Sequence, residues 1–258
     1  MLSTIISWEL FFMKAVILAG GLGTRLLPLT AATNKHLLPV YDKPMIYHPI
    51  QTVVNAGITD VMVVTGGPHA GDFIHVLKNG EEFGLDKIHY AYQEGEGGIA
   101  DALAKAETFV GDDNCLVILG DNLIFEDISP AVREFEARGK GATIFVKPVH
   151  DPERFGVVEY SESGLPISII EKPKNPPSND AVIGLYMYDS SVFEKCARLT
   201  ASERGELEIT DINNMYLKDM ELGVHQVQGT WIDCGTFDSL AKASHTLWSE
   251  RKQDKVPF

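Results

Sequence analysis

The stretch MKAVILAGGLGTR, residues 13–25, decides the fold of this chain. A lysine and a short apolar run predict a buried strand, which opens directly into a loop with three glycines, a threonine and Arg25. Glycine allows backbone N–H groups to approach a ligand closely, and an arginine offers a planar fork of donors that suits phosphate oxygens. The stretch therefore predicts a phosphate-binding loop at the carboxyl end of a strand, where open α/β sheets bind ligands.

Two familiar glycine-rich loops do not fit this stretch. The dinucleotide-binding pattern Gly-x-Gly-x-x-Gly needs a third glycine where Leu26 stands, and the P-loop needs a lysine directly after its last glycine. A plain strand-to-helix turn is the structural alternative. Three glycines followed by Arg25 favour the phosphate-binding interpretation.

Composition narrows the class of protein and its partners. The chain has 258 residues, of which 45% are hydrophobic and 22% charged, as is ordinary for a globular protein with a full core. Its formal net charge of −14 argues against a nucleic-acid polymer or an anionic membrane as partner, but not against a small phosphorylated ligand. The three cysteines are scattered, which predicts reduced thiols and a cytoplasmic location.

Residues 1–12 form an apolar leader. They lack an early basic residue and are interrupted by Glu9, so they make a poor signal peptide and are too short to span a bilayer. Because Met13 stands directly before the first strand, we expect the natural start near Met13 and an N-terminal extension before it. An apolar arm that packs on a neighbouring subunit is the alternative.

Short apolar strands alternate with helices through the first half of the chain. This pattern predicts an α/β fold with a doubly wound, mostly parallel sheet. The expected helices are 43–56, 72–78, 99–110 and 130–138, and the expected strands 60–65, 88–92, 115–119 and 142–146. Beyond them come strands at 156–160, 167–170 and 182–188, a helix at 208–222, a strand at 224–227 and a turn at 231–236 into a last helix. The second half is therefore expected to be a β-rich lid for a second substrate.

Two aspartates stand at the mouths of short apolar runs. Asp121 follows the strand at 115–119, and Asp233 precedes Gly-Thr at the start of the last helix. Each has a plain structural explanation, as a turn residue or a neighbour of a helix cap. Because Mg²⁺ prefers few carboxylates together with phosphate oxygens, two such residues beside a phosphate loop favour a magnesium site.

Other polar residues near expected strand ends complete a candidate two-anion site. Lys35 and Lys172 supply positive charge, although a lysine in a proline-flanked loop is usually a solvated surface charge. Gln93 can form paired hydrogen bonds to the edge of a nucleotide base through its amide, and Gly98 permits a ligand to approach the backbone closely. The alternative for Gln93 is a loop amide that is exposed to solvent.

Longer motifs follow one another in a characteristic order. They are LAGGLGTRLLPLT at 18–30, KHLLP at 35–39, YDKPMIY at 41–47, LGDN at 119–122, DPERFGVVE at 151–159, EKP at 171–173, RGELEITDIN at 204–213 and WIDCGT at 231–236. Together, from residue 14 to about 248, they resemble the sugar-phosphate nucleotidyltransferases, and most closely the branch that uses thymidine nucleotides.

The resemblance implies a Rossmann-like fold, a domain layout and a set of roles. It implies one domain over 13–250, with a nucleotide-binding part at about 13–147, a smaller sugar-binding part at about 148–235, a closing helix at about 236–250 and a tail at 251–258. The implied nucleotide-binding residues are Leu18, Gly20, Gly21, Gly23, Thr24, Arg25, Gln93 and Gly98. The implied sugar-phosphate residues are Asn122, Gly156, Glu171, Lys172 and Val182. The implied catalytic residues are Arg25, Lys35, Asp121, Lys172 and Asp233, with Asp121 and Asp233 holding Mg²⁺.

The reaction implied is transfer of a nucleotidyl group from dTTP to glucose-1-phosphate, which gives dTDP-glucose and pyrophosphate. The sugar phosphate is already an anionic nucleophile, so catalysis reduces to positioning two anions and neutralising charge. The same reaction with UTP is the nearest alternative, and a non-catalytic nucleotide-binding regulatory module is another. A nicotinamide-dependent oxidoreductase is disfavoured by the missing third glycine.

The chain departs from the family pattern in two places. The longer thymidylyltransferases carry a further helical segment after the last matched helix, whereas only residues 249–258 follow here. We expect a homo-oligomer. Without that helical segment, the sequence leaves open whether a downstream dTDP-sugar inhibits the enzyme and whether the chain forms the tetramer usual for the longer enzymes. The expected base loop, residues 93–101, also carries extra acids and has Asp101 where a neutral amide is more usual, so the choice between thymidine and uridine nucleotides is open as well.

Overall fold

The computed structural model describes the backbone of residues 13–254 and the side chains of residues 13–251. The leader at 1–12 and residues 255–258 lie outside the described residues, so the interpretation of the leader stays a prediction. No helix within the described part is long and apolar enough to cross a membrane.

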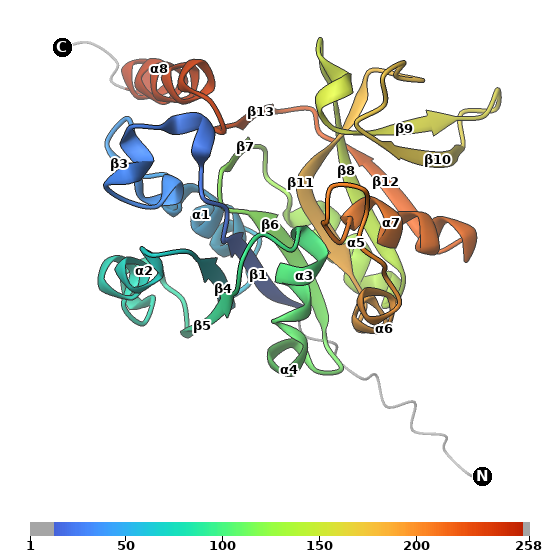
Figure 1. The fold of residues 1–258 in the computed structure, drawn as a ribbon, viewed down its shortest axis with the longest axis horizontal. Helices are drawn as coiled ribbons and strands as arrows, with labels where there is room; N and C mark the ends of the chain where they lie inside the picture. The colour runs from blue at the N-terminus through green and yellow to red at the C-terminus, as the bar shows by residue number, and fades with distance from the viewer. Residues whose placement is uncertain (1–12, 255–258) are drawn as a thin grey trace.

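A nine-stranded sheet forms the centre of the molecule (Figure 1). One half of the sheet is a run of parallel strands, β6 (Asn114–Leu119), β1 (Met13–Ala19), β4 (Asp60–Gly66) and β5 (Lys87–Gln93), in that spatial order. β1 lies between β4 and β6, with Ile17 paired to Val63 on one side and Ile118 on the other. These strands are apolar on both faces because helices cover both, which confirms the expected doubly wound α/β fold.

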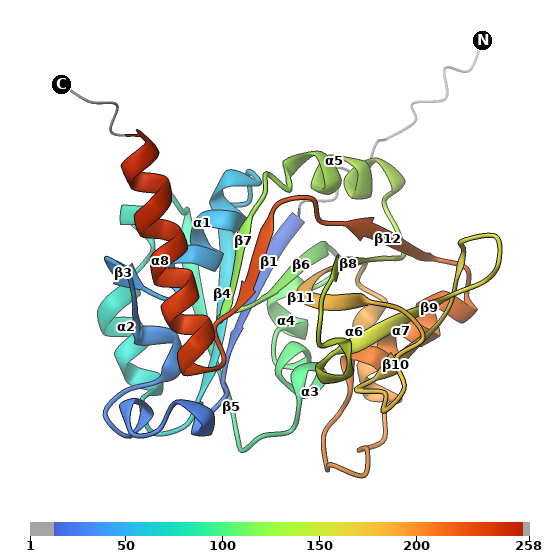
Figure 2. The same ribbon diagram turned by 90° about the horizontal axis from the view of Figure 1, so that it is seen from above.

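The second half of the chain extends the same sheet. β11 (Asp180–Tyr188) pairs antiparallel with β6 and is flanked further out by two pairs of strands. These pairs are β9 (Gly156–Tyr160) with β10 (Pro166–Glu171), and β8 (Ala142–Pro148) with β12 (Leu222–Gln226). The β-rich part is therefore continuous with the parallel strands through β11 (Figure 2).

Two apolar cores lie on the two faces of the sheet, because alternate residues of β1 point to opposite sides. One core includes side chains of α1 (Tyr47–Asn55), α2 (Ala70–Leu77) and α5 (Ser129–Arg138). The other includes those of α3 (Ile99–Ala104), α4 (Glu107–Val110), α6 (Val192–Ala197) and α7 (Ile209–Lys218). A smaller cluster lies under α8 (Phe237–Asp254), the long red helix at the upper left of Figure 1.

Several predicted boundaries were wrong. The helix expected at 43–56 begins only at Tyr47, because β3 (Lys43–Pro44) pairs with β2 (Pro39–Val40). The helix expected at 99–110 is divided into α3 and α4, and the one expected at 208–222 spans only Ile209–Lys218. α6 was not predicted. The last helix continues to Asp254, so the expected tail at 251–258 begins as helix.

A two-stranded sheet brings the two candidate aspartates together. β7 (Asn122–Phe125) pairs antiparallel with β13 (Thr230–Asp233), although the sequence predicted turns at both places. Asn122 lies opposite Asp233 in this register. Asp121 and Asp233, separated by more than a hundred residues in sequence, therefore become neighbours at the carboxyl end of β6.

Candidate active site

Two adjoining cavities open where β1 and β6 end. Their volumes are about 540 Å³ and 250 Å³, and Ile99, Leu119 and Asp121 line both. Leu18, Gly20, Gly21, Lys35, Gln93 and Gly98 also line the smaller cavity. Arg25, Asn122, Gly156, Glu171, Lys172, Val182 and Asp233 also line the larger one. The structure thus gathers most of the predicted residues at one place. The predicted sugar residues line the larger cavity and most of the predicted nucleotide residues line the smaller one, but Arg25, predicted to bind the nucleotide, lines the larger cavity.

Two predicted nucleotide-binding residues lie outside both cavities. Gly23 has φ of +66°, and a Cβ there would stand 2.8 Å from the Lys35 Cβ and 2.9 Å from the Thr30 Cγ2. This glycine is therefore needed for the turn and for packing on Lys35. Thr24 lines a separate hollow with Leu22 and Thr30. In this structure neither Gly23 nor Thr24 faces the site that the sequence assigned to it.

Lys35 and Asp121 form an ion pair at the junction of the cavities. The Lys35 Nζ lies 2.5 Å from the Asp121 Oδ2, and Asn122 Nδ2 donates to the Asp121 Oδ1 at 3.1 Å. Burial opposes ionisation of Asp121, but the Lys35 ammonium holds the pKa of its carboxyl below the ordinary value. Burial also lowers the pKa of neighbouring His36 to about 3, so its imidazole is neutral and Lys35 is the cation that faces Asp121.

Asp233 is in the opposite electrostatic situation. Burial, followed by the nearby Asp121 carboxylate, raises the pKa of Asp233 to about 6. The nearby cations Lys35, Arg25 and Arg154 lower the pKa of Asp233, but burial and Asp121 outweigh them. Two neighbouring carboxylates of this kind are donors that a divalent cation accepts. No group of three or more acidic, histidine or cysteine side chains with metal-binding geometry occurs among the described residues. The pair therefore fits Mg²⁺, which takes few carboxylates and completes its shell with water and phosphate oxygens.

Asp233→Asn is expected to raise the free energy of unfolding by roughly 1–3 kcal/mol at pH 8. Because the native pKa of about 6 lies above the ordinary 3.8, protonated Asp233 favours the fold below about pH 4, and that contribution is lost as the pH rises through 6. The advantage of the asparagine variant should therefore shrink between pH 8 and pH 5. Urea unfolding at both pH values, in buffer with EDTA, measures it. Exposed Asp112→Asn is the control, and no gain at pH 8 would contradict the electrostatic assignment.

Asn122 was predicted to contact the sugar phosphate, but its side chain is used by the protein. Its Oδ1 accepts from the Gly184 backbone N–H at 3.1 Å and from the Trp231 Nε1 at 2.6 Å, while its Nδ2 donates to Asp121. Gly184 is needed at this contact, since a Cβ there would stand 2.9 Å from the Asn122 Cγ. Although Asn122 lines the larger cavity, these bonds make it a residue that orients Asp121.

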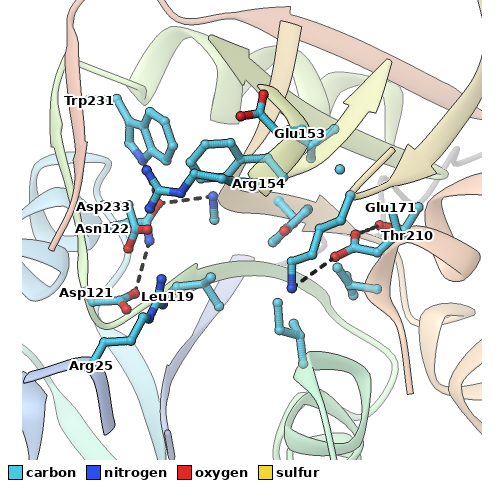
Figure 3. A pocket seen from close by; sticks show the side chains of 18 residues that line it. Arg25, Leu119, Asp121, Asn122, Glu153, Arg154, Glu171, Thr210, Trp231 and Asp233 are labelled. Carbon is cyan, nitrogen blue, oxygen red and sulfur yellow. Dashed lines mark hydrogen bonds and ion pairs between the residues drawn. The ribbon is translucent and has the colours of Figure 1, made fainter. Parts of the chain in front are cut away.

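Glu171 lies on the opposite wall of the larger cavity from Asp121 and Asp233 (Figure 3), and its chain neighbour Lys172 also lines this cavity. The Glu171 Oε2 accepts from the Thr210 Oγ1 at 2.6 Å, and its Oε1 lies 3.7 Å from the Lys172 Nζ. Lys172 has φ of +43°, an uncommon conformation for a residue with a side chain, and its N–H donates to the Phe155 carbonyl. An ammonium and a carboxylate thus face the cavity across from Asp121 and Asp233.

Several residues in or beside the larger cavity were not singled out from the sequence. Arg154 and Trp231 form part of the wall of the larger cavity, and Trp231 packs edge-on against Phe155. Arg204 does not line the cavity, but its guanidinium lies 2.8 Å from Glu208 and 3.4 Å from the cavity residue Glu171. Arg154, Phe155, Trp231 and Arg204 all lie inside motifs that carried the family resemblance. No spacing rule marks them individually, because their positions depend on contacts between distant segments.

A family profile described as "Nucleotidyl transferase" matches residues 14–250. The chain belongs to the nucleotidyl transferase family. Among its curated relatives, the Glucose-1-phosphate thymidylyltransferase of Neisseria meningitidis is 46% identical over 90% of this chain and 81% of its own. The Mycolicibacterium smegmatis protein of the same name is 44% identical, again over 90% of this chain and 81% of its own.

Solved structures of similar proteins agree with the fold. A Bacillus anthracis crystal structure, described as a candidate glucose-1-phosphate thymidylyltransferase in complex with a sucrose, has a TM-score of 0.87 and 48% identity. It covers 95% of this chain and 97% of its own. A UDP-glucose pyrophosphorylase complexed with UDP-glucose has a TM-score of 0.81 and 26% identity, covering 93% of this chain and all of its own.

Proposed function

We propose that this nucleotidyl transferase moves a thymidylyl group from dTTP to glucose-1-phosphate, producing dTDP-glucose and pyrophosphate. The observation that carries the proposal is the pair of cavities that meet at Asp121, one bordered by the glycine-rich loop and the other by Glu171 and Lys172. Identities of 41–46% to enzymes named for this activity support the choice of substrates.

In this proposal the nucleotide occupies the smaller cavity. The backbone of Gly20 and Gly21 and the Lys35 ammonium would contact the triphosphate, and Gln93 and Gly98 the base. The sugar phosphate occupies the larger cavity, where Lys172 would contact its phosphate and Glu171 its hydroxyl groups. Gly156 and Val182 line the same cavity and leave room for the sugar. The two anions then meet beside Asp121.

The chemistry needs no general base. An oxygen of the sugar phosphate attacks the α-phosphorus of dTTP in line, a new P–O bond forms, and the bond to the bridging oxygen breaks so that pyrophosphate leaves with its electron pair. Asp121 and Asp233 would hold Mg²⁺, which supplies neutralisation of phosphate charge when bound. Arg25 lines the cavity on the same side as these carboxylates and would meet charge that develops on the α-phosphate (Figure 3).

Pyrophosphate release from dTTP and glucose-1-phosphate with Mg²⁺ tests the proposal, with mass spectrometry to identify dTDP-glucose. We expect release only when both substrates and the metal are present. Omission of glucose-1-phosphate is the control for simple hydrolysis. Binding of dTTP without any turnover would favour the non-catalytic alternative, although Arg25, Asp121 and Asp233 are all present and line the larger cavity.

The same reaction with UTP is the second candidate. It is favoured by the structural neighbours complexed with UDP-glucose and, in Acinetobacter baumannii, bound to UTP, the latter with a TM-score of 0.77 and 25% identity. Comparing kcat/KM for dTTP and UTP at fixed glucose-1-phosphate separates the two. A larger value for UTP would reassign the nucleotide and leave the reaction class unchanged.

We further propose that the protein acts in the cytoplasm as a homo-oligomer, without a nucleic-acid or membrane partner. The formal charge of −14 and three buried cysteines with free thiols support this setting. Sedimentation velocity on the full chain measures the oligomeric state.

A further inference from the structure

The Gln93 amide lies deep in the smaller cavity and has a single orientation. Its Nε2 donates to the Asp101 carboxylate at 2.8 Å and to the Gly98 carbonyl at 3.0 Å, and the residue as a whole is 6% exposed. The Gly98 carbonyl can only accept a hydrogen bond, and the Asp101 carboxylate accepts the second one, so the amide nitrogen must face them. The orientation therefore follows from the chemistry of the neighbours.

Asp101 is itself held in place. It stands in the first turn of α3, and its Oδ1 lies 3.2 Å from the Lys105 Nζ one helical turn later. Its Oδ2 accepts from Gln93. The Gly98 carbonyl is fixed as well, because Ala102 N–H donates to it at 3.2 Å. Both acceptors of the Gln93 amide thus belong to the start of one helix and move together.

The other end of the amide faces the cavity. The Gln93 Oε1 lies over Gly20, 2.7 Å from where a Cβ on Gly20 would stand, and both residues line the smaller cavity. Among the residues that the structure describes, none donates a hydrogen bond to this oxygen. With both amide hydrogens committed to the protein, Gln93 offers a ligand one group, a hydrogen-bond acceptor.

We propose that Asp101 is a specificity-determining positioning residue, which locks the Gln93 amide so that the site selects pyrimidines carrying an N3–H. This rests on the proposed function, in which the base occupies the smaller cavity. Thymine and uracil present N3–H as a donor, whereas cytosine presents N3 as an acceptor and would place two lone pairs against each other. The contact does not read the C5 methyl group, so it excludes cytidine nucleotides without separating dTTP from UTP.

Binding of nucleotides to the full chain, measured by calorimetry, tests this independently of turnover. The wild-type chain should bind dTTP at least about 100-fold more tightly than dCTP, and more tightly than N3-methyl-dTTP by a similar factor, as expected when a polar group in the site is left unpaired. Near-equal binding of dTTP and N3-methyl-dTTP would overturn the proposal.

Two substitutions of Asp101 distinguish loss of the hydrogen bond that positions Gln93 from loss of the negative charge. Asp101→Leu removes the acceptor at similar size and should reduce the preference for dTTP over dCTP by at least about tenfold. Asp101→Asn removes the charge but keeps a side-chain oxygen that can accept from the Gln93 Nε2, which leucine lacks, so its preference should stay within about threefold of wild type. An unchanged preference in a folded Asp101→Leu variant would overturn the assignment. Normal selectivity in binding without pyrophosphate release would instead count against the proposed function alone.

Discussion

Asp121→Asn is expected to lower the rate of nucleotidyl transfer by at least about 10³-fold while leaving the chain folded. Asp121 borders both cavities, and its carboxylate lies 2.5 Å from the Lys35 Nζ. Asparagine keeps an oxygen that can accept from Lys35 and so preserves the local contact. It removes the negative charge with which Asp121 would hold Mg²⁺, and with it the neutralisation of phosphate charge that the metal would supply.

Steady-state pyrophosphate release at several Mg²⁺ concentrations measures the effect, with circular dichroism and thermal unfolding to establish that the variant is folded. Asp112→Asn is the matched control, because it removes the same charge from an exposed carboxylate just before β6. We expect the control to keep the wild-type rate. An Asp121→Asn variant with normal turnover and normal Mg²⁺ dependence would contradict the magnesium assignment.

The central sheet could be predicted because its strands carry a local signal. Strands buried on both faces read as continuous apolar runs, as in β1 and β6, and helices between them follow their own periodicity. β7 and β13 lack such a signal. Each is four residues long. Each forms because it pairs with the other, and the two strands are more than a hundred residues apart in the sequence. A window of sequence shows turn residues there, and the long-range pairing overrides them.

The candidate site could be predicted only in part, for a similar reason. Glycines after a strand and aspartates at strand ends have positional meaning, so Gly20, Gly21 and Asp121 could be named in advance. The contacts of Asn122 could not be foreseen, because its oxygen is used by Gly184 and Trp231 from two distant strands. Whether a polar side chain faces a ligand or the protein depends on packing that no local pattern records.

Arg25→Ala is expected to lower kcat by at least about 100-fold while changing the KM for glucose-1-phosphate by less than about threefold. Arg25 is exposed in the short 3-10 turn after the glycines, and its guanidinium lies 3.0 Å from where a Cβ on Gly235 would stand, next to Asp233. Substrate phosphate charge is already shared with Lys35 and Lys172 in the proposed complex. Arg25 is therefore expected to stabilise mainly the negative charge that develops on the α-phosphate in the transition state.

Initial rates over a matrix of dTTP and glucose-1-phosphate concentrations give both constants. Arg133→Ala, an exposed arginine on α5, is the control for loss of one surface cation and should leave kcat unchanged. Arg25→Lys should recover only part of the rate, because an ammonium lacks the planar fork that matches two phosphate oxygens. An Arg25→Ala variant that raises KM at constant kcat would show that Arg25 binds the ground state and does not act on the transition state.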